Sequence, residues 1–182
     1  MDKFELLSSE ALSFTIKRLA FEIYERHYPL QNVVIIGLQP RGVLLSERIV
    51  TEVKSLPGGE NIKSGCLDVT FHRDDFRHRE TPLLPSQTRI DFLVEGAKVI
   101  LVDDVLYTGR TIRAGLDALL TFGRPAKVEL MVLLDRRYSR DLPIQPDYVG
   151  KTVDTITSER VQVSFAEADG EDHVWLLTDK PH

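Results

Sequence analysis

Short apolar runs alternate along the chain with segments in which apolar residues recur every three or four positions. Continuous runs rich in β-branched residues are typical of strands buried on both faces, and they occupy 32–38, 97–105 and 126–135. The three- to four-residue spacing predicts helices, here over 8–28, 43–53 and 111–123. Because strands alternate with helices, we expect an α/β fold with a central, mainly parallel sheet flanked by helices.

The first predicted helix has a recognisable start and one apolar face. Ser8 or Ser9 can cap its N-terminus with a side-chain oxygen. The residues expected to be buried on this helix are Leu12, Ile16, Leu19, Ala20 and Ile23. Gly123 is expected to end the last of the three helices, because glycine readily adopts the conformation that ends a helix.

A charged segment interrupts the alternation. It follows a predicted strand over 65–73, in which Leu67, Val69 and Phe71 share one face. The stretch from about 72 to 88 ("HRDDFRHRETPLLPSQ" and the next residue) is crowded with charge and contains two prolines. A connection of this length inside a compact domain is usually a functional lid or disordered, so we interpret it as a flexible loop.

The region from about 136 to 182 has a different character from the rest of the chain. Short strands and turns are expected at 143–155, 159–167 and 172–179. We expect them to form a small subdomain over the edge of the sheet.

Length and composition narrow the class of protein. The 182 residues, 1–182, fit one domain. No apolar run approaches the roughly 20 residues of a membrane span, and the acidic N-terminus is unlike a secretory signal. The single cysteine, Cys66, suits a reducing cytoplasm and is interpreted as a packed side chain. The net charge of −5 argues against strong generic nucleic-acid binding, although a local basic patch is compatible with it.

The stretch "VILVDDVLYTGRT", 99–111, carries the clearest chemistry. It joins a buried strand, the acids Asp103 and Asp104, and a Thr-Gly-containing turn that leads into a helix. Ligands of open α/β sheets bind beyond the carboxyl ends of the strands, and the N–H groups of a helix N-terminus bind anions. Carboxylates accept hydrogen bonds from a diol, so the stretch describes a ribose 5-phosphate site.

A plainer interpretation is that Asp103 and Asp104 cap the helix and that the turn only connects two elements. We would favour it for an isolated acidic pair, but the ordered combination favours a binding site. The chain contains neither a Walker A loop nor the Rossmann pattern GxGxxG.

This stretch resembles the phosphoribosyl pyrophosphate (PRPP) signature of type I phosphoribosyltransferases. It is most similar to that of the bifunctional pyrimidine operon regulator/uracil phosphoribosyltransferase family. The likeness continues in "GLQPRGVLLSERI", "LDVTFHRDD", "RAGLDALLTFGRPAKVELMVLLDR" and "LPIQPDYVGK", and so covers nearly the whole chain. It implies the type I phosphoribosyltransferase fold, with a small hood subdomain at about 136–182 and a flexible catalytic loop at about 72–88.

The resemblance also implies an activity, the conversion of uracil and PRPP to UMP and pyrophosphate. Asp103 and Asp104 would be catalytic residues that hold the ribose hydroxyls, with Arg73 as a third catalytic residue. The 5-phosphate would be cradled by the residues after the acids, namely Val105, Leu106, Tyr107, Thr108, Gly109, Arg110 and Thr111.

Pyrophosphate would be bound by the "QPRG" loop and by the charged loop. The residues implied are Pro40, Arg41, Gly42, Arg73 and Arg77. Taken alone, "QPRG" is equally compatible with a plain helix start that has Pro40 near its first position. Mg²⁺ would be bound mainly through PRPP, with no direct protein ligand assigned, because magnesium keeps several of its waters.

Base recognition and RNA binding are where the chain departs from the family pattern. Asp135, Arg136 and Arg137 in the hood would contact the base, but "DRRYSR" replaces the usual "DRG" followed by His and Arg. Lys17, Arg18 and Lys151 are candidates for contacting an mRNA leader. Phe21 stands where the family has a histidine, and we expect it on or beside the apolar stripe of the first helix.

Three functions remain open from the sequence. The first is a uracil phosphoribosyltransferase. The second is an RNA-binding attenuator of pyrimidine genes that senses UMP or UTP with the same fold, and the third is a purine phosphoribosyltransferase. The resemblance further implies a homodimer or a higher homo-oligomer.

Overall fold

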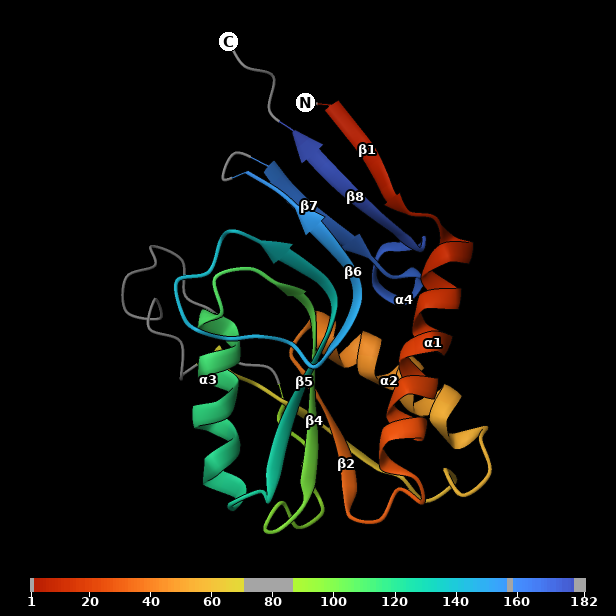
Figure 1. Cartoon of the computed structure of the whole chain (residues 1–182), viewed down its shortest axis with the longest axis vertical. Coiled ribbons are helices and arrows are strands. Elements are labelled where there is room, and N and C mark those ends of the chain that lie inside the picture. The colour runs from red at the N-terminus through yellow and green to blue at the C-terminus, as the bar shows by residue number, and fades with distance from the viewer. Residues whose placement is uncertain (1, 71–86, 157–158, 179–182) are drawn as a thin grey trace.

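The main sheet has five strands in the order β3-β2-β4-β5-β6, all parallel. The computed structural model describes residues 2–70, 87–156 and 159–178. The strands are β2 (Val33–Leu38), β3 (Lys63–Leu67), β4 (Lys98–Leu106), β5 (Lys127–Arg137) and β6 (Tyr148–Asp154). Helices α1 (Ser9–His27) and α2 (Arg41–Lys54) cover one face, and α3 (Arg110–Leu119) covers the other (Figure 1). The predicted α/β fold is confirmed.

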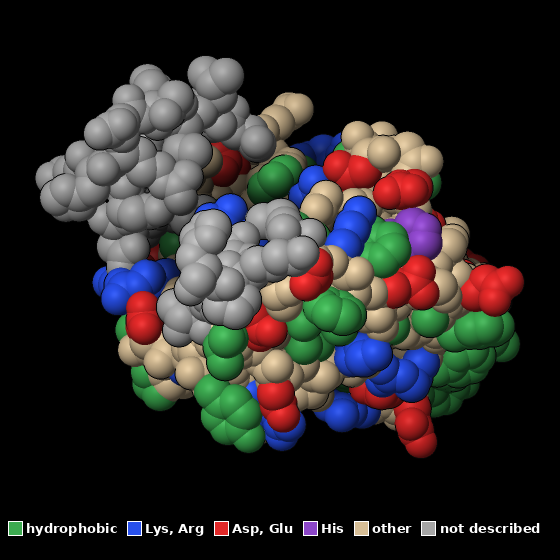
Figure 2. All heavy atoms as spheres, turned by 90° about the horizontal axis from the view of Figure 1, so that it is seen from above, with side chains coloured by type: hydrophobic (Ala, Val, Ile, Leu, Met, Phe, Trp, Pro, Cys, Tyr) green, Lys and Arg blue, Asp and Glu red, His purple; other side chains and the backbone are tan. Residues whose placement is uncertain are grey.

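A second, antiparallel sheet forms the hood, in the order β1-β8-β7. It consists of β1 (Asp2–Leu7), β7 (Glu159–Ser164) and β8 (His173–Thr178), with the short helix α4 (Ala166–Asp169) between the last two. Figure 1 places it above α1 and α2. Seen from above, the visible surface of this end carries acidic and basic side chains interleaved (Figure 2).

The hood differs in membership from the expected 136–182. The N-terminal strand β1 belongs to it, and β6 lies in the main sheet instead, paired in parallel with β5. Both are edge strands of their sheets and are only partly buried. Neither therefore has the continuous apolar run by which the central strands are recognised.

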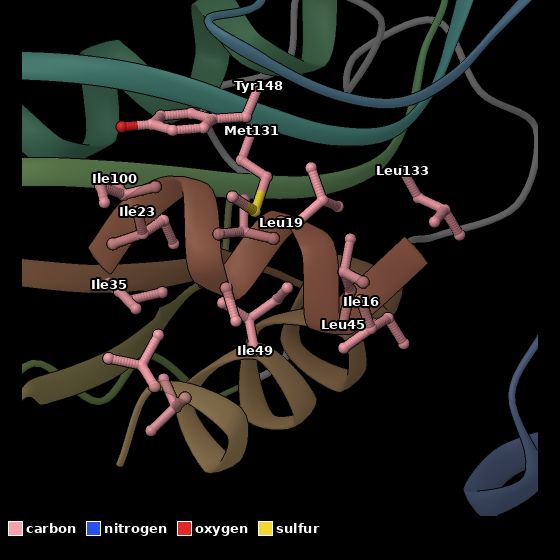
Figure 3. Packing of buried hydrophobic residues seen from close by; sticks show 14 of the residues in the cluster. Ile16, Leu19, Ile23, Ile35, Leu45, Ile49, Ile100, Met131, Leu133 and Tyr148 are labelled. Atoms are coloured by element: carbon pink, nitrogen blue, oxygen red, sulfur yellow. The ribbon is translucent and has the colours of Figure 1, made fainter. Parts of the chain in front are cut away.

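The core consists of two apolar clusters, one on each face of the main sheet. Neighbouring residues of a strand point to opposite faces, so Ile35 packs toward α1 and α2 while Ile36 packs on the α3 side. Figure 3 shows the first cluster, in which Ile16, Leu19 and Ile23 of α1 face Leu45 and Ile49 of α2 and the strand residues Ile35, Ile100 and Met131. The five residues predicted to be buried on the first helix are all buried.

The element ends follow local hydrogen bonding. Ser8 caps α1, since its Oγ accepts a hydrogen bond from the amide of Ala11 at 3.2 Å. The strand expected over 65–73 ends earlier, at Leu67, because the Asp68 carboxylate accepts hydrogen bonds from the Thr70 amide and hydroxyl and bends the chain. The last predicted helix ends in a 3₁₀ turn, η2 (Leu120–Phe122), before Gly123.

Among the described residues, no helix is both long and apolar enough to span a membrane. Cys66 is a free, buried cysteine, as expected.

Candidate functional site

The candidate residues of the first buried strand and of the acidic stretch converge at the carboxyl ends of β2 and β4. These two strands are neighbours in the sheet. The loop after β2 leads into α2, and the turn after β4 leads into α3. Two helix N-termini, each with unpaired backbone N–H groups, therefore begin at one edge of the sheet.

Asp103 and Asp104 lie inside β4, not beyond its end, because the strand continues to Leu106. Asp103 is 7% exposed and its Oδ1 accepts a hydrogen bond from the Asp104 amide at 3.0 Å. Asp104 is half-buried, and its Oδ1 accepts one from the Val105 amide at 2.9 Å. Burial raises the pKa of Asp104 above its usual range, although the interaction with the Asp103 side chain, the hydrogen bond from the Val105 amide and the charge of Arg41 oppose the shift. An acid with such a perturbed pKa in the last part of a strand is typical of a functional site.

The turn after β4 has the backbone of an anion-binding helix start. Gly109 is the N-cap of α3 and has φ of 92°, which favours glycine. The amide of Arg110 donates to the Thr108 Oγ1 at 3.4 Å, and the Arg110 Nε lies 3.1 Å from the Asp141 carboxylate. A Cβ on Gly109 would meet Ile144 at 3.2 Å. The segment around 141–144 thus supports the turn from outside.

The "QPRG" loop packs directly against the acidic strand. Its Gln39–Pro40 peptide bond is cis, and α2 begins at Arg41. A Cβ on Gly42 would lie 2.4 Å from the Val102 carbonyl oxygen and 3.2 Å from the Asp103 Oδ1. Only glycine allows this approach, so the predicted pyrophosphate loop and the predicted ribose acids are in contact.

Arg41 is held by the hood. Its Nη1 and Nη2 lie 2.7 and 3.0 Å from the two carboxylate oxygens of Asp169. The negative charge of Asp104 also acts on this guanidinium. Asp169 was not anticipated from the sequence, since nothing in its local pattern connects it with a residue 128 positions away.

The three residues assigned to the base have partners within the protein. The Asp135 carboxylate accepts a hydrogen bond from Arg140. Arg136 is 6% exposed, donates to the Thr155 hydroxyl and the Glu159 carbonyl, each at 2.9 Å, and lies over the Tyr107 ring at 4.0 Å. The exposed Arg137 forms a two-bond ion pair with Asp154 at 2.7 and 3.0 Å.

Arg140 is a second residue that sequence reasoning missed. Its guanidinium donates to the carbonyl oxygens of Tyr107 at 2.6 Å, Arg136 at 3.0 Å and Ile144 at 3.0 Å, as well as to Asp135. It therefore connects the altered "DRRYSR" segment to the start of the turn after β4. The only signal available in the sequence was the position of this arginine at the end of that altered segment.

Two of the three basic residues considered for RNA bind backbone carbonyls of the protein itself. Arg18 on α1 donates to the Gly150 carbonyl at 2.5 Å and pairs with Glu22 at 2.8 Å, while Lys151 on β6 donates to the Leu6 carbonyl at 2.8 Å. Lys17 is exposed. Phe21 is 57% exposed, so the expectation that it lies on or beside the buried stripe of α1 is wrong.

The predicted loop residues Arg73 and Arg77 lie outside the described residues. Within the described ranges, no group of three or more His, Cys, Asp or Glu side chains is arranged to hold a metal ion. The adjacent carboxylates of Asp103 and Asp104 fit a magnesium ion that takes most of its ligands from a substrate and from water.

Comparisons with known proteins agree with this geometry. A family model described as a phosphoribosyl transferase domain matches residues 4–168. The bifunctional protein PyrR of Desulfosudis oleivorans is 47% identical over 173 residues, 95% of each chain. That of Microcystis aeruginosa is 44% identical over 173 residues, 95% of this chain and 96% of its own.

Solved structures show the same fold. The hypoxanthine-guanine phosphoribosyltransferase of Bacillus anthracis has a TM-score of 0.71 at 19% identity, covering 98% of this chain and 100% of that one. At this identity the likeness concerns the fold alone. The sequence relatives and the family model confirm the resemblance drawn from the PRPP signature: the chain belongs to the phosphoribosyltransferase family, and within it to the PyrR bifunctional proteins.

Proposed function

We propose that this protein transfers the phosphoribosyl group of PRPP to uracil, giving UMP and pyrophosphate. The observation that carries the proposal is the contact between the "QPRG" loop and the acidic strand, where Gly42 fits only because it lacks a Cβ beside Asp103. The contact brings an anion-binding helix start next to two diol-binding acids. PRPP requires these two features side by side, because its pyrophosphate is attached to the ribose.

The residues would act mainly by positioning and by charge. Asp103 and Asp104 accept hydrogen bonds from the ribose hydroxyls, and the amides at the start of α3 bind the 5-phosphate. Arg41 and the Gly42 amide bind the pyrophosphate. The C1–O bond to pyrophosphate breaks with its electron pair going to the pyrophosphate, the C1–N bond to uracil N1 forms, and the N1 proton passes to the departing pyrophosphate or to water. Mg²⁺, bound mainly through PRPP, would neutralise part of the charge on the leaving pyrophosphate.

A nucleobase screen tests the proposal. The purified protein is incubated with PRPP, Mg²⁺ and one base at a time, and nucleotide formation is measured. We expect UMP from uracil, with hypoxanthine and guanine far less active. Turnover of hypoxanthine without turnover of uracil would establish the purine alternative instead.

A second function, nucleotide-dependent RNA binding, is favoured by the name of the relatives, which are called bifunctional. The structure gives it less support than the transferase. Arg18 and Lys151 bind backbone carbonyls of the protein itself, and acidic side chains interrupt the basic ones on the face seen in Figure 2. UMP-dependent retention of the operon leader RNA at low salt, where phosphate contacts are strongest, would support it.

We also propose that the protein forms a homodimer through the outer face of α1. Phe14, Phe21 and Tyr28 follow one another at seven-residue spacing and are 69%, 57% and 64% exposed. Seven residues are nearly two helical turns, so Phe14 and Phe21 of α1 and Tyr28, the residue directly after the helix, form a row, here called the aromatic row. Lys17 lies on one side of Phe21 and Glu25 on the other. Two antiparallel copies of α1 would therefore pair aromatic with aromatic and Lys17 of each copy with Glu25 of the other, as a twofold interface requires.

A further inference from the structure

Two arginine clusters attach the hood to α2. In the first, Arg48 pairs with Glu167 at 2.5 Å and with Asp172 at 2.7 Å. In the second, Arg41 pairs with Asp169 through two hydrogen bonds. The clusters contact the same short helix, α4, and its following loop, yet only the second involves the loop that we assign to pyrophosphate.

The hydrogen bonds of Arg41 to Asp169 come from Nη1 and Nη2, the same donors that would bind an anionic ligand. Both terminal nitrogens of Arg41 donate to Asp169, in the forked geometry by which arginine also binds phosphate oxygens. The pair is partly exposed, with side-chain exposures of 36% for Arg41 and 26% for Asp169. It is therefore accessible to a competing anion from solvent.

We infer that Asp169 is a positioning residue that holds Arg41 in the free protein and is exchanged for pyrophosphate oxygens when PRPP binds. The inference rests on the proposed function, because it takes Arg41 as the pyrophosphate residue. Charge is the reason for the exchange. The negative charges of Asp169 and Asp104 both act on the Arg41 guanidinium, and a further anion is repelled while the Asp169 carboxylate stays in place.

Asp169 is ionised throughout the physiological range. The hydrogen bond from Arg41 lowers the pKa of Asp169 to about 2, helped by one from the Phe165 amide. Pyrophosphate therefore competes with a permanent charge. By reciprocity, bound pyrophosphate must weaken the attachment of α4 to α2, while Arg48 keeps the hood attached through Glu167 and Asp172.

The test compares Asp169→Asn with Glu167→Gln. The asparagine keeps an oxygen for the Phe165 amide, whereas it removes the charge that competes for Arg41. The dissociation constant of magnesium pyrophosphate is measured by calorimetry, and kcat and KM for PRPP by steady-state kinetics. We expect Asp169→Asn to bind pyrophosphate more tightly, on the order of fivefold, with a lower KM and little change in kcat. Glu167→Gln weakens the ion pairs of Arg48 instead. It should leave the pyrophosphate dissociation constant and the KM for PRPP unchanged.

Amide hydrogen exchange distinguishes the proposed exchange of partners from a purely structural role of Asp169, which would give no response to pyrophosphate. Pyrophosphate should speed amide exchange in 166–170 of the parent protein and not in Asp169→Asn. Asp169→Ser, which also retains an oxygen near the Phe165 amide, replaces the asparagine variant if that one does not fold. If Asp169→Asn binds pyrophosphate no more tightly than the parent protein, the inference about Asp169 is wrong and the proposed function is unaffected. If the parent binds no pyrophosphate, the proposed function falls with it.

Discussion

At the scale of single residues, some members of the candidate site could be selected from the sequence and some could not. Asp103, Asp104 and the residues of the Thr-Gly turn could be selected from the sequence, because the motif is local and its order is specific. The partners of Arg41 and Arg136 could not, because Asp169 and Thr155 come from distant parts of the chain. A sequence shows which side chains are able to bind an anion. Only the fold shows that a carboxylate of the protein already forms an ion pair with one of them, as Asp169 does with Arg41.

Asp104→Asn removes the negative charge of the side chain and keeps its shape, so it tests whether catalysis depends on that charge. In the folded protein burial raises the pKa of Asp104, so the ionised carboxylate is less stable there than in the unfolded chain at neutral pH. The neutral amide should therefore leave the melting temperature unchanged or raise it. Turnover should fall by about 100-fold or more, the usual cost of losing one charged group aimed at the reacting centre.

Thermal unfolding and steady-state kinetics on Asp104→Asn check both parts. Full activity in this variant would mean that the ribose site is misplaced. A large drop in melting temperature together with lost activity would mean that Asp104 serves the fold instead.

Elements buried on both sides were predicted well, and elements at an edge were not. The run that forms β2 is apolar throughout, and those that form β4 and β5 are apolar over most of their length, because helices cover both faces of the sheet. Strand β1, with the sequence DKFELL, is mostly exposed, so its pattern has no clear period. The placement of β6 in the main sheet depends on pairing with β5, which no local pattern records.

One polar network at the far end of the sheet joins α1, β5 and β6. Glu129 lies 2.7 Å from His27 and 2.7 Å from the Tyr148 hydroxyl, and Lys127 donates to its second oxygen at 2.5 Å. Burial alone would raise the pKa of Glu129, but the hydrogen bonds from Lys127, Tyr148 and His27 outweigh it and lower the pKa to about 2. The ionised form is therefore favoured by folding.

The sign of this shift makes a pH prediction. A lowered carboxyl pKa stabilises the protein above the unfolded value of about 4.5, and this contribution is lost as the pH falls toward about 2. Glu129→Gln should lower the free energy of unfolding at pH 7 by about 3 kcal/mol, as expected when one partner of a buried pair is removed. It should also flatten the dependence of stability on pH between about 4.5 and 2. Urea unfolding at pH 7 and pH 3 measures both, and a difference between parent and variant that is the same at both pH values would contradict the assignment.

At the scale of the whole molecule, the outer face of α1 is the surface that the monomer leaves unexplained. The proposed transferase site uses the carboxyl ends of β2 and β4 with the starts of α2 and α3. The buried residues of α1 all belong to the core. The aromatic row is mostly exposed in one chain, although the Tyr28 ring lies 5.4 Å from that of Tyr24. Large exposed apolar patches usually mark an interaction site, and the length of this row along one helix suits a second copy of the same helix.

Phe21→Ser tests the dimer at the centre of the row. Because Phe21 would lie at the twofold axis, one substitution removes two facing rings, and a central aromatic is typically worth more than about 1 kcal/mol in an interface. The dimer dissociation constant, measured by sedimentation equilibrium, should rise by about tenfold or more, while the melting temperature at high dilution stays near that of the parent. Leu93→Ser is the matched control, since Leu93 is 83% exposed and lies outside α1. If Leu93→Ser dissociates the dimer and Phe21→Ser does not, the subunits associate through another face and the row needs a different partner.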